Sequence, residues 1–216
     1  MQRLRTRFRR GEEIKYISHL DIMRLWERAL RRAQVQVAYS EGFNPRPRIS
    51  LAAPLSVGVT SEAELMDIFL TRSVSPNWFT AAVSRQLPRG IEVVDVYPIA
   101  PGLPSLQSQV RSAEYEVEVA TDRKSQEIEA AISRLLSLEH LPWHHERDTG
   151  RRNYNLRPLI DDLWLIDRCN SYCTLGMRLR CDNSGAGRPE QVALALGFSD
   201  YPNSIRRTRL YLQAKV

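Results

Sequence analysis

The fold is decided by a short stretch near the start of the chain, Leu4-Arg5-Thr6-Arg7-Phe8-Arg9-Arg10 and then Ser18-His19-Leu20-Asp21-Ile22. The first segment alternates apolar and basic residues, which predicts a strand with one exposed face. Ser18 and Asp21 form a capping-box pattern, which satisfies the free N–H groups at a helix start. Apolar residues at helical spacing then predict an amphipathic helix with a buried stripe, Ile22, Trp26, Ala29, Leu30 and Ala33.

Strand and helix patterns continue on the C-terminal side of this helix. We expect extended segments at 35–39, 48–55, 63–71 and 91–97. A second helix is expected from Ser75-Pro76, because proline fits the first turn of a helix. Its predicted buried stripe is Trp78, Ala82, Val83 and Leu87. The first half thus has the order strand, helix, strand, strand, helix, strand.

The second half repeats this order after a polar, proline-rich connector. Strands are predicted at 114–120, 161–168, 172–180 and 207–213, and helices at 125–138 and 189–196. We therefore expect an α+β protein with two tandem ferredoxin-like (βαββαβ) domains, each with an antiparallel sheet. The expected boundaries are 1–98 for the first domain, 99–111 for the linker and 112–216 for the second domain.

Composition excludes several classes of protein. The apolar runs are far shorter than the roughly twenty residues that span a bilayer, and the first residues lack the apolar core of a signal peptide. The three cysteines are odd in number, and their spacing matches neither a zinc ribbon nor an iron–sulfur cluster motif. We expect a cytoplasmic protein without membrane contact, cofactor or bound metal.

Positive charge is concentrated at one end of the chain. Residues 1–48 contain 12 Lys and Arg against 5 Asp and Glu, whereas the net charge of the whole chain is +6. A localised basic surface beside a helix start indicates a polyanionic partner, with RNA as the first candidate.

Two features in this basic region have the chemistry for RNA contact. The loop 42–48 combines an aromatic ring, an amide and two guanidinium groups on a backbone stiffened by prolines, so Phe43 can stack on a base while Arg46 and Arg48 hold phosphates. His19 lies in the first helical turn, where it can contact phosphate or act as an acid or base. A second basic stretch, residues 147–158, contains Arg157.

Two blocks of sequence, Lys15 to Arg24 and Ala38 to Arg48, resemble the bacterial radical SAM-linked protein family, a family of unknown function. The likeness continues through Pro54 to Gly58, and more weakly through 156–159 and 207–211. It implies a radical SAM protein as partner, because family members are encoded beside such enzymes or fused to them. The expected tandem layout also resembles CRISPR repeat-processing endoribonucleases, which grip RNA with paired domains of this type.

The leading hypothesis is a non-catalytic RNA-binding accessory protein that presents ribosomal or transfer RNA to a radical SAM enzyme for modification or processing. The predicted RNA contacts are Lys15, Arg24, Phe43, Asn44, Arg46, Arg48 and Arg157. One alternative is a metal-independent endoribonuclease with His19 as its catalytic residue. The other is a protein-interaction module whose basic loops dock on a radical SAM partner.

Overall fold

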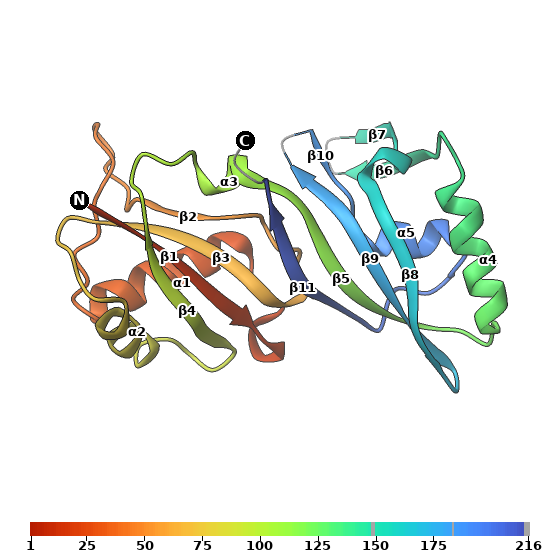
Figure 1. Ribbon diagram of the computed structural model, residues 1–216, viewed down its shortest axis with the longest axis horizontal. Coiled ribbons are helices and arrows are strands. Elements are labelled where there is room, and N and C mark those ends of the chain that lie inside the picture. Colours follow the sequence, from red (N-terminus) through yellow and green to blue (C-terminus); the bar gives the residue numbers. More distant parts are fainter. Residues whose placement is uncertain (148–149, 183, 214–216) are drawn as a thin grey trace. The chain divides into compact units, whose positions relative to one another are not determined.

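A computed structural model describes residues 1–147, 150–182 and 184–213, with the side chains of 145–147 and 150–152 excepted (Figure 1). The chain has a mixed α+β fold with few helices and mostly antiparallel strand pairing. It divides into two units, Met1–Val110 and Arg111–Val216.

Unit 1 contains four strands and two main helices. In chain order they are β1 (Gln2–Arg10), α1 (His19–Arg32), β2 (Ile49–Leu51), β3 (Thr60–Leu70), α2 (Pro76–Ser84) and β4 (Ile91–Ile99). The sheet order is β4-β1-β3-β2, and each neighbouring pair is antiparallel. A short 3-10 helix (Glu12–Ile14) follows β1, and the four-residue helix α3 (Leu106–Gln109) follows β4.

The core of unit 1 lies on the sheet face that α1 and α2 cover. Leu4 and Phe8 of β1 and Met66 of β3 are fully buried there against Trp26 of α1 and Phe79 of α2. The Phe8 and Trp26 rings meet edge to face, with centroids 4.9 Å apart. This apolar contact fixes α1 against the sheet, and the opposite side of the helix faces solvent.

The exposed basic face that the alternation predicted for β1 is confirmed only in part: Arg7 and Arg9 are exposed, but the other arginines of the strand are not. Arg3 and Arg5 are buried, and both pair with the fully buried Asp67 of β3, at 2.6 and 2.8 Å. Arg10 is also buried and donates to the backbone carbonyls of Ile14 and Ile17. For the three buried arginines the prediction was wrong, because a buried carboxylate and backbone carbonyls satisfy these cations inside the fold.

Two other local predictions differ from the structure. Residues 35–39 form only single bridges, Val37 to Leu70 and Tyr39 to Pro47, because residues 48–51 already occupy most of that edge of β3. In α2 the buried residues are Phe79 and Val83. Trp78, predicted inside, is 46% exposed, since the stripe that meets the sheet begins one position later.

Unit 2 has the same succession of elements with an inserted hairpin. Its elements are β5 (Val110–Ala120), α4 (Ser125–Leu136), β6 (Pro142–Arg147), β7 (Gly150–Asn155), β8 (Ile160–Cys169), β9 (Tyr172–Asp182), β10 (Gly185–Ala186), α5 (Pro189–Ala195) and β11 (Ser204–Leu212). The order of its main strands is β11-β5-β9-β8, and β10 pairs with the end of β9. A 3-10 helix, Arg157–Leu159, precedes β8.

Two segments expected to be irregular have regular structure. About half of the connector 99–111 belongs to the end of β4, to α3 or to the start of β5. Part of the basic stretch 147–158 is strand β7, which pairs with β6 in a separate two-stranded sheet. Asp148 and Thr149 of that stretch lie outside the described residues. None of the described helices is long and apolar enough to cross a membrane.

Candidate nucleic-acid interface

Helix α1 is positioned by its cap and by its buried stripe. The N–H of Asp21 donates to Ser18 Oγ at 3.2 Å, and the Ser18 hydroxyl donates to Asp21 Oδ2 at 2.7 Å. This hydroxyl contact, with the charges of Arg24 and Arg28, lowers the pKa of Asp21. The predicted stripe is confirmed: Ile22, Trp26, Ala29 and Leu30 are buried, and Ala33 is partly buried.

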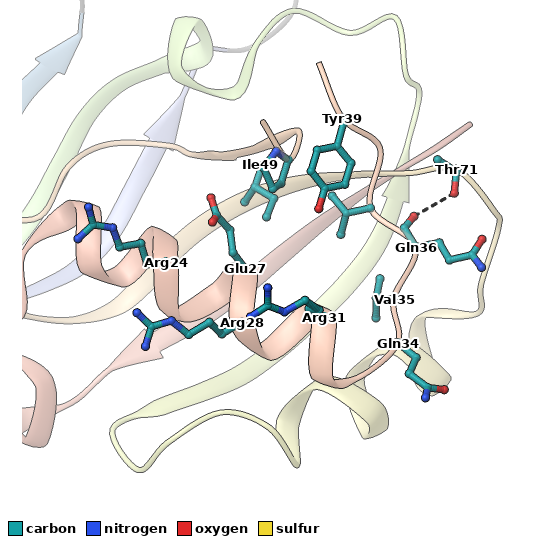
Figure 2. Close-up of a pocket in the computed structure, with 12 residues that line it drawn as sticks. Arg24, Glu27, Arg28, Arg31, Gln34, Val35, Gln36, Tyr39, Ile49 and Thr71 are labelled. Atoms are coloured by element: carbon teal, nitrogen blue, oxygen red, sulfur yellow. Dashed lines mark hydrogen bonds between the residues drawn. The ribbon is translucent and has the colours of Figure 1, made fainter. Parts of the chain in front are cut away.

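The outward side of α1 forms one wall of a cavity of about 640 Å³ (Figure 2). Arg24, Glu27, Arg28 and Arg31 line it from the helix. The facing wall comes mainly from the chain between α1 and the start of β2, with one residue just after β3. Its lining residues are Gln34, Val35, Gln36, Val37, Tyr39, Pro47, Ile49 and Thr71. All of these residues belong to unit 1.

The facing wall is held by backbone hydrogen bonds. Gln34 lies just after the C-cap of α1 with a φ of 56°, and the N–H of Val35 donates to Leu30 O at 3.0 Å. The Gln36 carbonyl accepts from the N–H and the hydroxyl of Thr71, at 2.9 and 3.3 Å. The cavity is therefore preformed, and the 58% exposed ring of Tyr39 lines it (Figure 2).

The charges at this cavity favour an anion. Arg24 pairs with Asp21 at 3.2 Å, but its side chain is 64% exposed. Within the described part of the chain, the guanidinium groups of Arg28 and Arg31 form no hydrogen bond or ion pair, and both residues are exposed. Glu27 is the single acidic residue among those that line the cavity. Three guanidinium groups stand against two carboxylates, those of Glu27 and of Asp21, the ion-pair partner of Arg24. The balance is still net positive, so the site can neutralise phosphate.

The basic surface continues on the other side of α1. A second cavity, of about 510 Å³, lies between α1 and the end of α2. Arg28 lines both cavities, while Arg32 and Arg85 line only the second. The helix thus carries several cations between two cavities, and a polyanion with several phosphates needs several such cations to bind.

The loop before β2 is constrained at its base and exposed at its tip. The N–H of Ser40 donates to Arg46 O at 2.8 Å, and the N–H of Arg46 donates to Ser40 Oγ at 3.0 Å. Gly42 has a φ of 118°, a conformation that favours glycine. Phe43 is completely exposed, and Asn44 and Arg46 are also exposed. This loop runs out from the body of unit 1 just before β2 (Figure 1).

Other predicted contacts have partners within the protein. Lys15 forms an ion pair with Glu12 at 2.6 Å, and that hydrogen bond raises the pKa of Lys15. The Arg48 guanidinium lies 4.1 Å from the centre of the Phe69 ring and is half-buried. His19 is the first residue of α1 and is also half-buried.

Arg157 lies in unit 2 and holds the end of α4. Its Nη2 donates to Leu136 O at 2.9 Å, and its Nη1 donates to Ile160 O at 2.7 Å. Cations at a helix C-terminus satisfy carbonyls that have no partner within the helix. The guanidinium is therefore engaged in the fold of unit 2, and the interface described here does not include it.

Sequence reasoning placed Arg24 at the interface but did not select Arg28, Arg31 or Tyr39. The three arginines have helical spacing, at 24, 28 and 31, so one face of the predicted helix could have been recognised. Tyr39 could not, because its position depends on the return of the chain along β3.

The described residues contain no group of three or more His, Cys, Asp or Glu that could hold a metal ion. His140, His144 and His145 are close in sequence, and the side chain of His145 lies outside the described part. The cysteines Cys169, Cys173 and Cys181 are free.

The fold and this basic surface define a two-unit α+β protein with a positively charged helix face. The chain belongs to an uncharacterised protein family conserved in bacteria (DUF2344), whose family model matches residues 3–189. A search of the curated proteins finds no match.

Solved structures share the fold at low identity. A chain in the crystal structure of a Cbf5-Nop10-Gar1 complex matches 99% of this chain at 9% identity, with a TM-score of 0.52. A chain in the structure of an H/ACA RNP bound to a substrate RNA containing 2'-deoxyuridine matches 99% at 10% identity, with a TM-score of 0.50. This protein spans 50% and 49% of the lengths of those chains.

Proposed function

We propose that this protein binds RNA through α1 and the loop 40–48 and serves as a non-catalytic accessory to a radical SAM enzyme in RNA modification or processing. The observation that carries the proposal is the cavity that Arg24, Arg28 and Arg31 line together with the ring of Tyr39. Arginine holds phosphate through paired N–H groups, and tyrosine offers a face on which a base can stack.

The aromatic residues favour a nucleic acid over a simple anion. Tyr39 lines the cavity. Phe43 is exposed at the tip of the loop 40–48, whose base is held by hydrogen bonds next to the cavity. Exposed aromatic rings beside arginines are typical of single-stranded RNA recognition, where unpaired bases stack on side chains. One structural neighbour is bound to a substrate RNA, and RNA is therefore the first polyanion to test.

The accessory role rests on the family resemblance and on the chemistry of the site. The resemblance implies a radical SAM partner that supplies the radical chemistry, and this protein would present ribosomal or transfer RNA to it. The three free cysteines fit a reducing cytoplasm. We further propose that both units are ferredoxin-like, because β4-β1-β3-β2 and β11-β5-β9-β8 are the same order of equivalent strands.

The test is the salt dependence of RNA binding. Fluorescence anisotropy with a labelled 12-nucleotide single-stranded RNA should show affinity that falls steeply between about 50 and 200 mM salt. Arg28→Ala and Arg31→Ala should each weaken binding and reduce the slope of log K against log salt by about one. Arg134→Ala is the matched control, since Arg134 is an exposed arginine on α4 in the other unit.

Four outcomes would contradict the proposal or favour an alternative to it. Binding that ignores salt, or that falls equally in Arg134→Ala, would show that α1 is not the phosphate-binding surface. Cleavage of the RNA in EDTA that disappears in His19→Ala while binding survives would instead support an endoribonuclease. A stable complex with the radical SAM protein from which RNA is absent would favour the protein-interaction module.

A further inference from the structure

A separate cavity of about 450 Å³ lies within unit 2, and neither the basic surface nor the proposed function involves it. One wall is the start of the β6–β7 hairpin, and the other is α5 with the chain after it. Cavities of this size hold small organic ligands. The residues that line it include Trp143, Glu190, Gln191, Ser199 and Tyr201.

Two aromatic rings line this cavity. Trp143 is half-buried and pairs across the hairpin with Tyr154, whose hydroxyl donates to Gln191 Oε1. This hydrogen bond ties the hairpin to α5. Tyr201 follows α5 and is 65% exposed. Indole and phenol rings at one cavity favour a flat, aromatic ligand, since stacking on such rings is a main source of affinity for bases.

The polar groups at the cavity offer acceptors and donors. The Glu190 side chain is 19% exposed, and it forms a long ion pair, 3.9 Å from its Oε1 to Arg188 Nη1. Gln191 is 5% exposed, and because its Oε1 accepts from Tyr154, its amide nitrogen remains as the donor. Ser199 adds a hydroxyl. A ligand that fills this cavity must therefore donate to a carboxylate and accept from an amide.

His144 also lines the cavity, but no lysine or arginine is among the described residues that line it, and the carboxylate of Glu190 repels phosphate. Burial raises the pKa of Tyr201, and the negative charge of Glu190 raises it further, so that hydroxyl stays protonated at neutral pH. The part of a ligand held inside is therefore uncharged and rich in N–H groups. Among the bases, guanine presents two adjacent donors, N1–H and N2–H, that match the two oxygens of a carboxylate, and its O6 accepts from an amide.

We propose that this cavity binds a guanine base, with Glu190 accepting from its N1–H and N2–H groups and with the Trp143 ring stacking on it. The base can come from a free guanine nucleotide or from an unpaired guanosine of an RNA. Adenine lacks the paired donors and places a ring acceptor where the carboxylate lies. A quaternary ammonium group fits the rings but has nothing to accept from Gln191 or Ser199.

Isothermal titration of the full chain with nucleosides tests the proposal without any phosphate. Guanosine should bind saturably and at least about tenfold more tightly than adenosine or cytidine, with little dependence on salt. Glu190→Gln should weaken guanosine binding about ten- to hundredfold and abolish the preference. Glu129→Gln, which removes the same charge from an exposed position on α4, should change nothing.

The stacking role of the Trp143 ring is tested by Trp143→Ala, which should weaken the binding of all nucleosides. Trp143→Phe keeps an aromatic ring at this position and should retain binding. It is the control in case Trp143→Ala prevents the β6–β7 hairpin from forming. No binding of guanosine, equal binding of all nucleosides, or binding of tetramethylammonium in its place would each overturn the proposal. These results are independent of the α1 variants, because the nucleosides carry no phosphate.

Two further ligands distinguish an RNA from a free nucleotide as the source of the guanine base. If an RNA supplies it, a U4GU4 oligonucleotide should bind more tightly than U9, and Glu190→Gln should remove that difference. If a free nucleotide is the ligand, guanosine monophosphate should bind at least as tightly as the oligonucleotide, and the two oligonucleotides should bind alike.

Discussion

The indole ring of Trp164 covers Gly176, the residue directly opposite it in the β8–β9 pair. A Cβ atom added to Gly176 would lie 1.9 Å from Trp164 Cε2, far inside van der Waals contact. Glycine at this strand position therefore makes room for an aromatic side chain, and the ring in turn covers backbone that glycine leaves bare.

Gly176→Ala should destabilise unit 2, because the added methyl group would push the half-buried indole ring off the backbone that it covers. We expect the free energy of unfolding to fall by about 1–3 kcal/mol, as for other overpacked cores, measured by urea denaturation. Gly102→Ala is the control, since nothing lies within 4 Å of its Cβ position. Adding Trp164→Ala should lessen the effect of Gly176→Ala, and strictly additive losses would contradict the steric explanation.

Asp67→Asn should strongly destabilise unit 1. Asp67 is fully buried between Arg3 and Arg5, and the change removes the one carboxylate that balances both guanidinium groups. Breaking a buried ion pair on one side costs about 3–5 kcal/mol. Asp95→Asn, at an exposed position on β4, should leave the denaturation midpoint unchanged. Equal midpoints for the two variants would show that the buried pair contributes little.

The same residues show what the sequence could and could not reveal. Alternation in β1 and the Ser18 cap before α1 are local signals, because they depend on neighbouring residues alone, and both elements lie where they were predicted. Burial of Arg3 and Arg5 depends on Asp67, which is more than sixty positions away. No local pattern identifies such a partner, so the charged side of β1 was assigned to solvent.

The candidate interface was predictable in part for the same reason. Arg24, Arg28 and Arg31 share a helix face whose period can be read directly, and the loop 40–48 contains the glycine and prolines that shape it. Tyr39 reaches the cavity only through hydrogen bonds between residues 36–38 and the end of β3. The β6–β7 hairpin was missed because its sequence has little apolar alternation.

Arg157→Ala separates a structural role from RNA contact. Its guanidinium donates to Leu136 O and Ile160 O, so the variant should lose about 1–3 kcal/mol of stability from hydrogen bonds made by a charged group. RNA affinity measured well below the unfolding transition should stay within twofold, roughly 0.4 kcal/mol, of the original. A loss of RNA affinity at unchanged stability would instead return Arg157 to the interface.

Cys169 and Cys173 should differ in reactivity. Burial raises the pKa of the Cys173 thiol, and the charges of Arg168 and Arg123 offset this only in part, so the fraction of thiolate stays low near neutral pH. Cys169 is exposed. Iodoacetamide at pH 8 should therefore modify Cys169 much faster in the folded protein, as mass spectrometry of the peptides would show. In denaturant the two should react at similar rates, and comparable rates in the folded protein would exclude the protected site.

Phe43→Ala should weaken RNA binding without changing stability. The ring is completely exposed, so its removal costs the fold nothing, whereas a stacked base is worth about 1–3 kcal/mol of binding free energy. Phe43→Trp should retain the affinity, and Val57→Ala, at another exposed apolar residue, should have no effect. An abasic RNA of the same length makes the test specific to stacking. The original protein should bind it more weakly than the intact RNA, and Phe43→Ala should reduce that difference. If Phe43→Ala weakens both RNAs equally, the ring acts on the shape of the loop and not on a base.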